Sequence, residues 1–275
     1  MEYSYNGNVL YYEKYGEGHP IVILHSMGND HRSMKAWIEP IFEGAYGFER
    51  IYIDVPAHGK SIINEQIQST QDMVDLLLQF IETEVENSPF SLIGHSYGGY
   101  LAQGIMDVKL DQVSGICLLA PAIHVKNRST SPKVVRERDE VLLSSMEPSI
   151  REAFETLFIY QNKKNYDLFL EEVQPGRELV DRNFLLSNWR EKGYYLENEP
   201  FKDKFNLEHS ALIILGKQDA ICGYKDHFMF LDIFNHVTFT VIDEAGHLMT
   251  IEKREFVQQL VREWVFERLY PVVKC

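Results

Sequence analysis

The sequence contains few cysteines and no long apolar run. Cys117, Cys222 and Cys275 are the three cysteines among 275 residues, and none belongs to a Cys-x-x-Cys pair. An odd number of cysteines without that spacing predicts neither a disulfide framework nor a zinc knuckle. Met1 to Asn8 lack a basic start and an apolar core, and no stretch of about 18 apolar residues follows. We therefore expect a cytoplasmic protein in a reducing compartment, without a membrane partner.

Positive charge is scarce relative to negative charge. The chain has 27 basic and 41 acidic residues, for a formal net charge of -14. Such a field repels phosphate backbones and anionic lipid heads, so we expect no nucleic-acid partner. The 10 histidines are scattered without the close spacing of a metal site, and we expect no metal. Apolar residues make up 45% of the chain, which is enough for a full globular core.

Short apolar runs alternate with helical patterns along the chain. Alternating residues on both sides of Asn6-Gly7 predict an N-terminal hairpin. Continuous apolar runs, typical of strands covered on both faces, occur at 20–25, 50–54, 90–94, 113–119, 211–216 and 236–242. Helical patterns occur at 70–85, 97–107, 224–234 and 253–269. This alternation predicts an α/β fold with a doubly wound, mostly parallel sheet.

The alternation of strands and helices stops between residues 124 and 207. Two helical stripes are visible in this segment, one formed by Ile150, Phe154, Leu157 and Phe158 and the other by Tyr166, Phe169, Leu170 and Val173. We predict a helical cap at 124–207, inserted between two parts of the core at 1–123 and 208–275. Its aromatic residues would cover an apolar pocket, and the sequence leaves open which of them line it.

Residues 94–98 read Gly-His-Ser-Tyr-Gly and stand between a predicted strand and a predicted helix. In that context the Gly-x-Ser-x-Gly pattern is typical of a nucleophile elbow, a sharp turn that exposes a serine hydroxyl above the sheet. Glycines are needed there because strand and helix approach closely. We predict that Ser96 is the nucleophile; the alternative is a glycine-rich turn with an ordinary N-cap serine. His95 is expected to point away from Ser96 and to pack.

A serine nucleophile needs a general base, and the base needs an acid that orients it. Asp219 and His247 each follow a late predicted strand, so both belong at the carboxyl edge of the sheet. The order Ser96, Asp219, His247 is the order found in open α/β sheets with such an elbow. We predict His247 as the base and Asp219 as the acid. Asp243 is the rival acid, but it begins the same loop as His247.

Two backbone amides are candidates for an oxyanion hole. The helix that begins at Tyr97 directs its first NH groups toward the serine. Residues 25–28 read His-Ser-Met-Gly and follow a predicted strand, where folds of this kind place a second donor. We predict the backbone NH groups of Met27 and Tyr97 as the pair. His25 is expected to brace the loop.

Together these motifs resemble the α/β-hydrolase family, in the branch that carries a helical cap. The resemblance spans nearly the whole chain outside 124–207, and its motifs are the elbow at 94–98, the turn at 54–61, Gly216 with Asp219, and Gly246 with His247. Two positions depart from the family pattern. Ser26 stands where the oxyanion loop usually has glycine, and Ala57 stands where glycine is common in the 54–61 turn.

The serine at position 96 narrows the chemistry that this resemblance implies. Haloalkane dehalogenases and soluble epoxide hydrolases have aspartate there, and dienelactone hydrolases have cysteine. The Gly-Gly-Pro-Gly sequence typical of proline iminopeptidases is absent. The resemblance therefore implies an enzyme that is a carboxylesterase, lactonase, thioesterase or carbon-carbon bond hydrolase of a diketone, with acyl transfer as a lesser alternative.

The implied mechanism is acylation of Ser96 followed by hydrolysis of the acyl-enzyme, without a cofactor. We expect the partner to be a small to medium, largely apolar small molecule. A ligand-binding, receptor-like protein with little turnover is the alternative from another functional class, because it would also be compatible with an intact triad. The sequence leaves open whether the protein is a monomer or a homo-oligomer.

Overall fold

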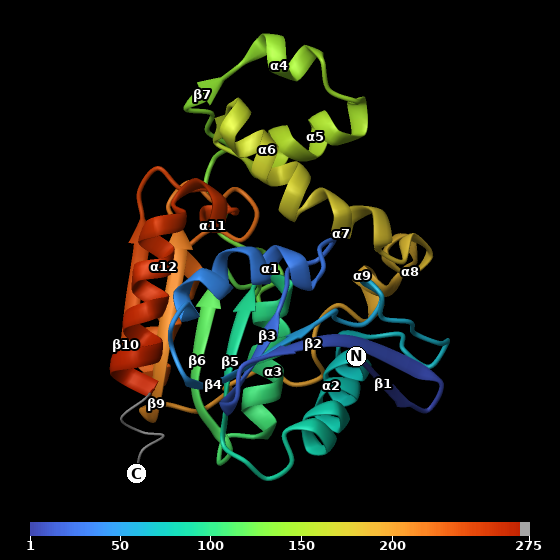
Figure 1. Ribbon diagram of the computed structural model, residues 1–275, viewed down its shortest axis with the longest axis vertical. Helices are drawn as coiled ribbons and strands as arrows, with labels where there is room; N and C mark the ends of the chain where they lie inside the picture. The colour runs from blue at the N-terminus through green and yellow to red at the C-terminus, as the bar shows by residue number, and fades with distance from the viewer. Residues whose placement is uncertain (270–275) are drawn as a thin grey trace.

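An eight-stranded sheet runs through the centre of the protein (Figure 1). The computed structural model describes residues 1–269, so Cys275 lies outside the described residues. The strands of the sheet are β1 (Glu2–Tyr5), β2 (Asn8–Tyr15), β3 (Gly18–Leu24), β4 (Gly47–Ile53), β5 (Phe90–His95), β6 (Val113–Leu119), β9 (Leu207–Gly216) and β10 (Phe234–Ile242). Their order across the sheet is β1-β2-β4-β3-β5-β6-β9-β10.

Most neighbouring strands are parallel, as the sequence predicts. β2 pairs antiparallel with β1 and with β4, and the other pairs of the sheet are parallel. The predicted hairpin joins β1 and β2, where Asn6 and Gly7 have φ values of 48° and 79° and so suit a type I′ turn. Because β3, β5, β6, β9 and β10 run in the same direction, the loops after them gather at one edge of the sheet.

Helices cover both faces of the sheet. The helices and turns of the core are α1 (His31–Ile38), η1 (Glu39–Phe42), α2 (Thr70–Glu84), α3 (Tyr97–Val108), η2 (Lys225–Met229), α10 (Phe230–Ile233), α11 (Met249–Glu252), α12 (Arg254–Glu263) and the π-helical turn η3 (Trp264–Leu269). α2 and α3 pack into one hydrophobic cluster, and α1 and α12 pack into a second cluster on the other face. This arrangement confirms the predicted α/β fold class.

The structure differs from the sequence analysis in one predicted helix and contains one helix that was not predicted. The stretch 224–234 forms the 3₁₀ turn η2 and the four-residue α10 rather than one helix. The sequence does not predict α1, because this helix has eight residues and its buried apolar side chains are Met34, Trp37 and Ile38 alone. Asp30 caps α1 by accepting a hydrogen bond from the Arg32 amide.

A group of short helices lies above the carboxyl edge of the sheet (Figure 1). Its elements are β7 (Glu137–Arg138), α4 (Glu140–Ser144), α5 (Pro148–Leu157), β8 (Tyr160–Gln161), α6 (Lys163–Glu172), α7 (Gln174–Leu179), α8 (Arg182–Leu186) and α9 (Trp189–Lys192). The two-residue strands β7 and β8 pair with each other and not with the main sheet. A third hydrophobic cluster joins α5 and α6 to Leu248 and Ile251 of the core. That the segment 124–207 is a separate unit stays a prediction.

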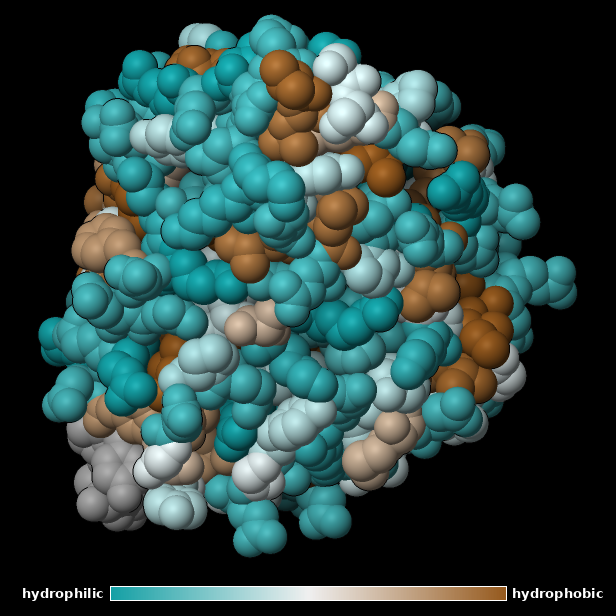
Figure 2. Space-filling view, turned by 45° about the horizontal axis from the view of Figure 1, so that its top comes forward, coloured by the Kyte–Doolittle hydropathy of each residue, from teal (hydrophilic) through white to brown (hydrophobic). Residues whose placement is uncertain are grey.

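The surface shown in Figure 2 is mainly hydrophilic, with apolar side chains in small, separate groups. Within residues 1–269, no helix combines the length and the apolar character that crossing a membrane requires.

Candidate active site

Ser96 occupies a sharp turn between β5 and α3. Its backbone has φ 53° and ψ -116°, a combination that residues with side chains rarely adopt. A Cβ atom on Gly98 would lie 2.3 Å from the Leu24 carbonyl oxygen, and one on Gly94 would lie 2.6 Å from the Gly98 carbonyl oxygen. Glycine at these two positions therefore lets α3 lie close against β5 and against the end of β3, and leaves Ser96 at the edge of the sheet.

The Ser96 hydroxyl faces a histidine. Ser96 is the N-cap residue of α3, and an N-cap serine normally accepts a hydrogen bond from an amide in the first helical turn. Its side chain makes no such bond. Instead, the hydroxyl oxygen lies 2.9 Å from Nε2 of His247. The geometry is that of a nucleophile and its base, not that of an ordinary helix cap.

Asp219 extends this contact to a buried chain of three side chains. Its Oδ2 lies 2.8 Å from His247 Nδ1, and its Oδ1 accepts hydrogen bonds from the Ile221 and Cys222 amides at 2.7 and 3.0 Å. Burial by itself would raise the pKa of the Asp219 carboxyl group, but His247 and the two amides outweigh burial and lower it. The ionised carboxylate orients His247 with Nδ1 protonated and Nε2 toward the serine.

Asp243, the rival acid, does not contact His247. Asp243 is exposed. Its Oδ1 accepts a hydrogen bond from the Gln218 side-chain amide at 2.9 Å and lies 3.2 Å from Lys217 Nζ. The contact with Gln218, together with that of Lys217, lowers the pKa of Asp243 to about 2. The structure thus brings Asp219 to the histidine and leaves Asp243 at the surface.

Two further histidines brace the loops around the predicted nucleophile. His95 Nε2 lies 3.1 Å from the His247 carbonyl oxygen, and the two rings lie 5.2 Å apart. His25 Nδ1 lies 2.8 Å from the Ser26 carbonyl oxygen, and His25 Nε2 accepts a hydrogen bond from the Val55 amide at 3.0 Å. Both histidines therefore have the supporting positions that the sequence predicts.

The loop after β3 lies beside the nucleophile. Ser26 and Met27 line the same cavity as Ser96 and Tyr97. In the described part of the chain, the backbone NH groups of Met27 and Tyr97 donate no hydrogen bond to another protein group. The Ser26 hydroxyl accepts a hydrogen bond from the Asn29 side chain at 2.7 Å and keeps its own hydrogen for a further acceptor. The role of Met27 and Tyr97 as an oxyanion hole stays a prediction.

A cavity of about 1000 Å³ opens over Ser96 and His247. Its walls come from the loop after β3, from the segment around Ile221 and from the helices above the sheet edge. Leu157 and Val173 contribute apolar surface from those helices. The volume is at the upper end of the range for small-molecule sites, roughly 300–1000 Å³.

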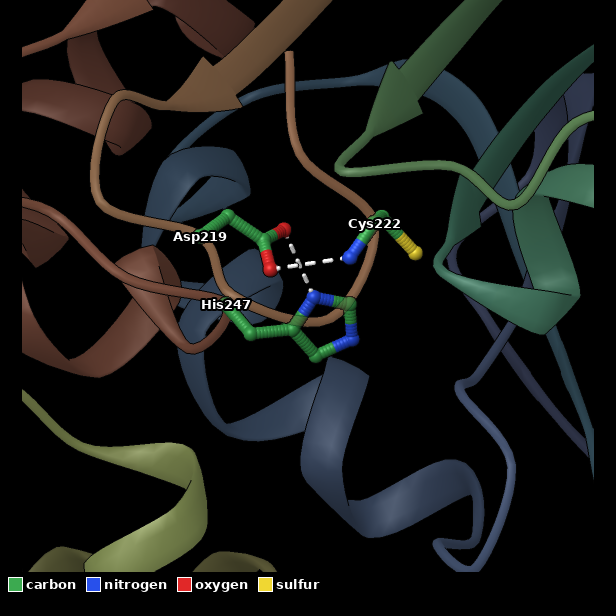
Figure 3. Close-up of side chains that lie close together, drawn as sticks. All are labelled: Asp219, Cys222 and His247. Carbon is green, nitrogen blue, oxygen red and sulfur yellow. Dashed lines mark hydrogen bonds and ion pairs between the residues drawn. The ribbon is translucent and has the colours of Figure 1, made fainter. Parts of the chain in front are cut away.

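Cys222 lies on the wall of this cavity, next to the acid and the base (Figure 3). Asp219, Cys222 and His247 each offer one potential metal-ligand atom, and these atoms lie within 4.8 Å of one another. Figure 3 shows, however, that Cys222 binds Asp219 through its backbone amide, while its sulfur points away from the carboxylate. Burial, with the charge of Asp219, raises the pKa of the Cys222 thiol to about 12.

A second group with potential ligand atoms lies at the start of α1. It consists of Asp30, His31 and Asp54. His31 Nδ1 lies 2.8 Å from Asp54, and His31 Nε2 lies 3.2 Å from Glu13. Both ring nitrogens thus contact carboxylates, and these contacts form a network that fixes the start of α1 to the 54–61 turn.

Sequence reasoning missed a carboxylate that holds the loop of the base. Glu252 accepts hydrogen bonds from the amides of Gly246, Ile159 and Tyr160 at 2.8, 2.7 and 3.2 Å. It therefore ties the residue before His247 to the segment around β8. No local sequence pattern marks this role, because the amides of Ile159 and Tyr160 come from a segment more than 90 residues away.

Comparison with known proteins supports the fold and a hydrolase activity. The family model described as serine aminopeptidase S33 matches residues 19–254. The chain is 25% identical over 270 residues to the (E)-2-((N-methylformamido)methylene)succinate hydrolase of Acinetobacter baylyi, covering 96% of this chain and 97% of that protein. It is 22% identical to the 2-hydroxy-6-oxo-6-(2'-aminophenyl)hexa-2,4-dienoic acid hydrolase of Metapseudomonas resinovorans, covering 89% and 83% of the two chains.

A solved structure has the same fold over its full length. An α/β superfamily hydrolase from Oenococcus oeni superimposes with a TM-score of 0.85 at 24% identity, covering 98% of this chain and 99% of that one. The family match extends over most of the chain and includes Ser96, Asp219 and His247. The chain therefore belongs to the serine aminopeptidase S33 family of α/β-hydrolases, and it is a hydrolytic enzyme.

Proposed function

We propose that the protein is a serine hydrolase that cleaves a small or medium carbonyl substrate through an acyl-enzyme on Ser96. The observation that carries the proposal is the orientation of the Ser96 hydroxyl, which faces His247 Nε2 at 2.9 Å instead of capping α3. A carboxylic ester is the substrate class that we favour, and lactones, thioesters and diketones present a similar carbonyl carbon to the same site. The relatives named as a methylenesuccinate hydrolase and a dienoic acid hydrolase support a hydrolytic function.

In the proposed mechanism, His247 Nε2 removes the proton from the Ser96 hydroxyl as Oγ attacks the carbonyl carbon. The amides of Met27 and Tyr97 donate hydrogen bonds to the oxyanion that forms. The imidazolium of His247, stabilised by Asp219, then protonates the leaving group, and the acyl group stays on Ser96. A water molecule repeats the sequence, with His247 as its base, and releases the acid and the free serine.

A fluorophosphonate probe tests this proposal directly. Such probes react quickly with a serine that has both a base and an oxyanion hole, so Ser96 should carry the label in a tryptic digest. Ser96→Ala should abolish both labelling and turnover of 4-nitrophenyl butyrate, with an unchanged circular dichroism spectrum. Ser145→Ala is a suitable control, because Ser145 is exposed and bonds to the Leu142 carbonyl oxygen.

Two results would contradict the proposal. Labelling of Ser96→Ala at the rate of the unaltered protein would remove Ser96 from the role of nucleophile. Stabilisation by ligands without labelling or turnover of any ester or diketone would favour a receptor-like protein on a hydrolase scaffold.

A further inference from the structure

Three arginines line the cavity over Ser96, although the chain as a whole carries a net charge of -14. They are Arg128, Arg177 and Arg190, and the other formally charged residue on the wall is Glu152. The cavity is therefore lined by more positive than negative charge. Low-dielectric walls of one charge sign focus the field and concentrate ligands of the opposite sign.

Within the described part of the chain, no carboxylate oxygen lies within 4.0 Å of these three guanidinium groups. Arg128 donates to the Tyr194 hydroxyl at 2.9 Å, Arg177 donates to the Gln174 side chain at 3.1 Å, and Arg190 lies 2.8 Å from the Met27 sulfur. Six other arginines do form ion pairs, namely Arg32, Arg50, Arg138, Arg151, Arg254 and Arg268. Among the described residues, Arg136, Arg182 and Arg262 also form no ion pair, but they do not line the cavity; Arg128, Arg177 and Arg190 are the arginines that bring an unneutralised charge to it.

The arginines approach the nucleophile from different sides. Arg128 Nη1 lies 3.7 Å from the sulfur of Cys222, whose amide binds the acid Asp219. Arg190 contacts Met27, in the loop predicted to bind the oxyanion. Arg177 extends from α7, in which Gly176 packs against the backbone of the same loop: a Cβ there would lie 2.6 Å from Asn29. The Arg128 guanidinium therefore lies near the predicted acid, the Arg190 guanidinium contacts the loop predicted to bind the oxyanion, and the helix that carries Arg177 packs against the same loop.

We propose that these arginines form a carboxylate-binding subsite, so that the enzyme selects substrates that carry at least one free carboxylate in addition to the scissile carbonyl group. Guanidinium groups bind planar carboxylates through paired hydrogen bonds. Glu152 can neutralise one of the three at most. Leu157 and Val173 would hold the apolar part of such a substrate. The substrate predicted from the sequence as largely apolar thus becomes an apolar chain with an anionic end.

The inference rests on the proposed function, because it assumes that an ester bond is cleaved. Its test compares pairs of esters in which one member carries a negative charge and the other is neutral. The first pair is 4-acetoxybenzoate and its neutral methyl ester, with the charge on the leaving group. The second pair is phenyl hydrogen glutarate and phenyl methyl glutarate, with the charge on the acyl group. In at least one pair, kcat/KM should be higher for the anion than for its neutral partner.

Removing each guanidinium should lower this preference. Arg128→Met, Arg177→Met and Arg190→Met keep an apolar stem, and at least one of them should lower the ratio of anionic to neutral kcat/KM roughly 10- to 100-fold, the range of one charge-assisted interaction. Arg262→Met is the matched control: Arg262 is exposed on α12, does not line the cavity and forms no ion pair among the described residues. This control should leave the ratio unchanged.

A binding experiment separates the failure of this inference from the failure of the proposed function. Glutarate should bind the Ser96→Ala protein in a calorimetric titration, and its affinity should fall when Arg128→Met or Arg177→Met is added. If no ester is hydrolysed but glutarate binds in this way, the serine mechanism is wrong and the carboxylate subsite stands. Three results would each overturn the inference. The neutral ester could be preferred in both pairs, or the ratio of anionic to neutral kcat/KM could stay the same in every arginine variant. The third is that inorganic phosphate binds more tightly than glutarate.

Discussion

The two oxygens of the Asp219 carboxylate have different partners. Oδ2 lies 2.8 Å from His247, whereas Oδ1 accepts two backbone amides from the turn that follows. The amides fix the carboxylate plane, so the direction in which Oδ2 approaches the imidazole is set by the backbone. An acid held in this way orients the base even when no substrate is bound.

Replacing this carboxylate by an amide should therefore impair catalysis more than folding. We expect Asp219→Asn to lower kcat by roughly 10³- to 10⁴-fold, because an amide NH₂ facing Nδ1 favours the wrong tautomer of His247. Asp243→Asn should cost far less, since Asp243 is exposed and contacts Gln218 and Lys217. Steady-state hydrolysis of 4-nitrophenyl butyrate by both variants provides the comparison. Near-normal turnover of Asp219→Asn, with a collapse in Asp243→Asn, would reverse the assignment of the acid.

The three residues proposed as a triad could be picked out from the sequence because each follows a recognisable strand within a few residues. Ser96 is marked by its neighbouring glycines, and Asp219 and His247 are marked by their places at the carboxyl ends of β9 and β10. The cavity arginines carry no such mark. Arg128 and Arg190 are 62 positions apart, and only the packing of the helices over the sheet edge brings both to one cavity.

At the scale of elements, Glu252 of α11 joins two parts of the active site. It holds the amide of Gly246, beside the base, and the amides of Ile159 and Tyr160, at the start of β8. Burial raises the pKa of Glu252, and the three amides act in the opposite direction. The His247 loop and the helical layer above it therefore share one anchor.

Glu252→Gln should loosen this anchor. The amide that replaces one carboxylate oxygen has NH groups that cannot accept from a backbone NH, so one of the two connections is lost at a cost of about 1–3 kcal/mol. We expect a melting temperature lower by roughly 2–10 °C, together with a several-fold lower kcat. Glu255→Gln is the control, because Glu255 is exposed on α12 and forms no ion pair among the described residues. A variant with unchanged kcat and unchanged melting would show that Glu252 anchors nothing.

The strands were easier to predict than the short helices for a physical reason. A strand buried on both faces, such as β3 or β6, contains a continuous apolar run, which is visible in the sequence without knowledge of tertiary contacts. α1 buries one side of two turns only, and α10 contains four residues, so neither shows a full helical period of apolar residues. Their boundaries depend on contacts with the rest of the protein.

At the scale of the whole molecule, several histidines are buried without charge. Burial lowers the pKa of His19 to about 4 and, with repulsion from neighbouring histidines, lowers the pKa values of His58 and His95 to about 3. In the unfolded chain each histidine has a pKa of about 6.5. Between that value and the folded values, the unfolded state binds more protons than the folded state, so the free energy of unfolding falls as the pH falls.

We therefore expect the melting temperature to decrease from pH 7 to pH 5, with each buried histidine contributing at most about 1.4 kcal/mol per pH unit. His19→Gln, whose side chain can keep the contact with the Ser91 hydroxyl, should make this dependence less steep. His236→Gln is the comparison, because His236 is exposed at the edge of the sheet. Differential scanning calorimetry of the three proteins gives the slopes. A melting temperature that is constant or higher at pH 5 would rule out this explanation.

The backbone of Ser96 has a consequence for the engineering of this enzyme. A left-handed conformation at a residue with a side chain costs of the order of 1–3 kcal/mol, and glycine would relieve most of it. Screening variants for heat resistance alone would therefore reward glycine at position 96, where it removes the proposed nucleophile. Any thermostability programme on this scaffold has to select for turnover at the same time, or it will enrich well-folded proteins that have lost their chemistry.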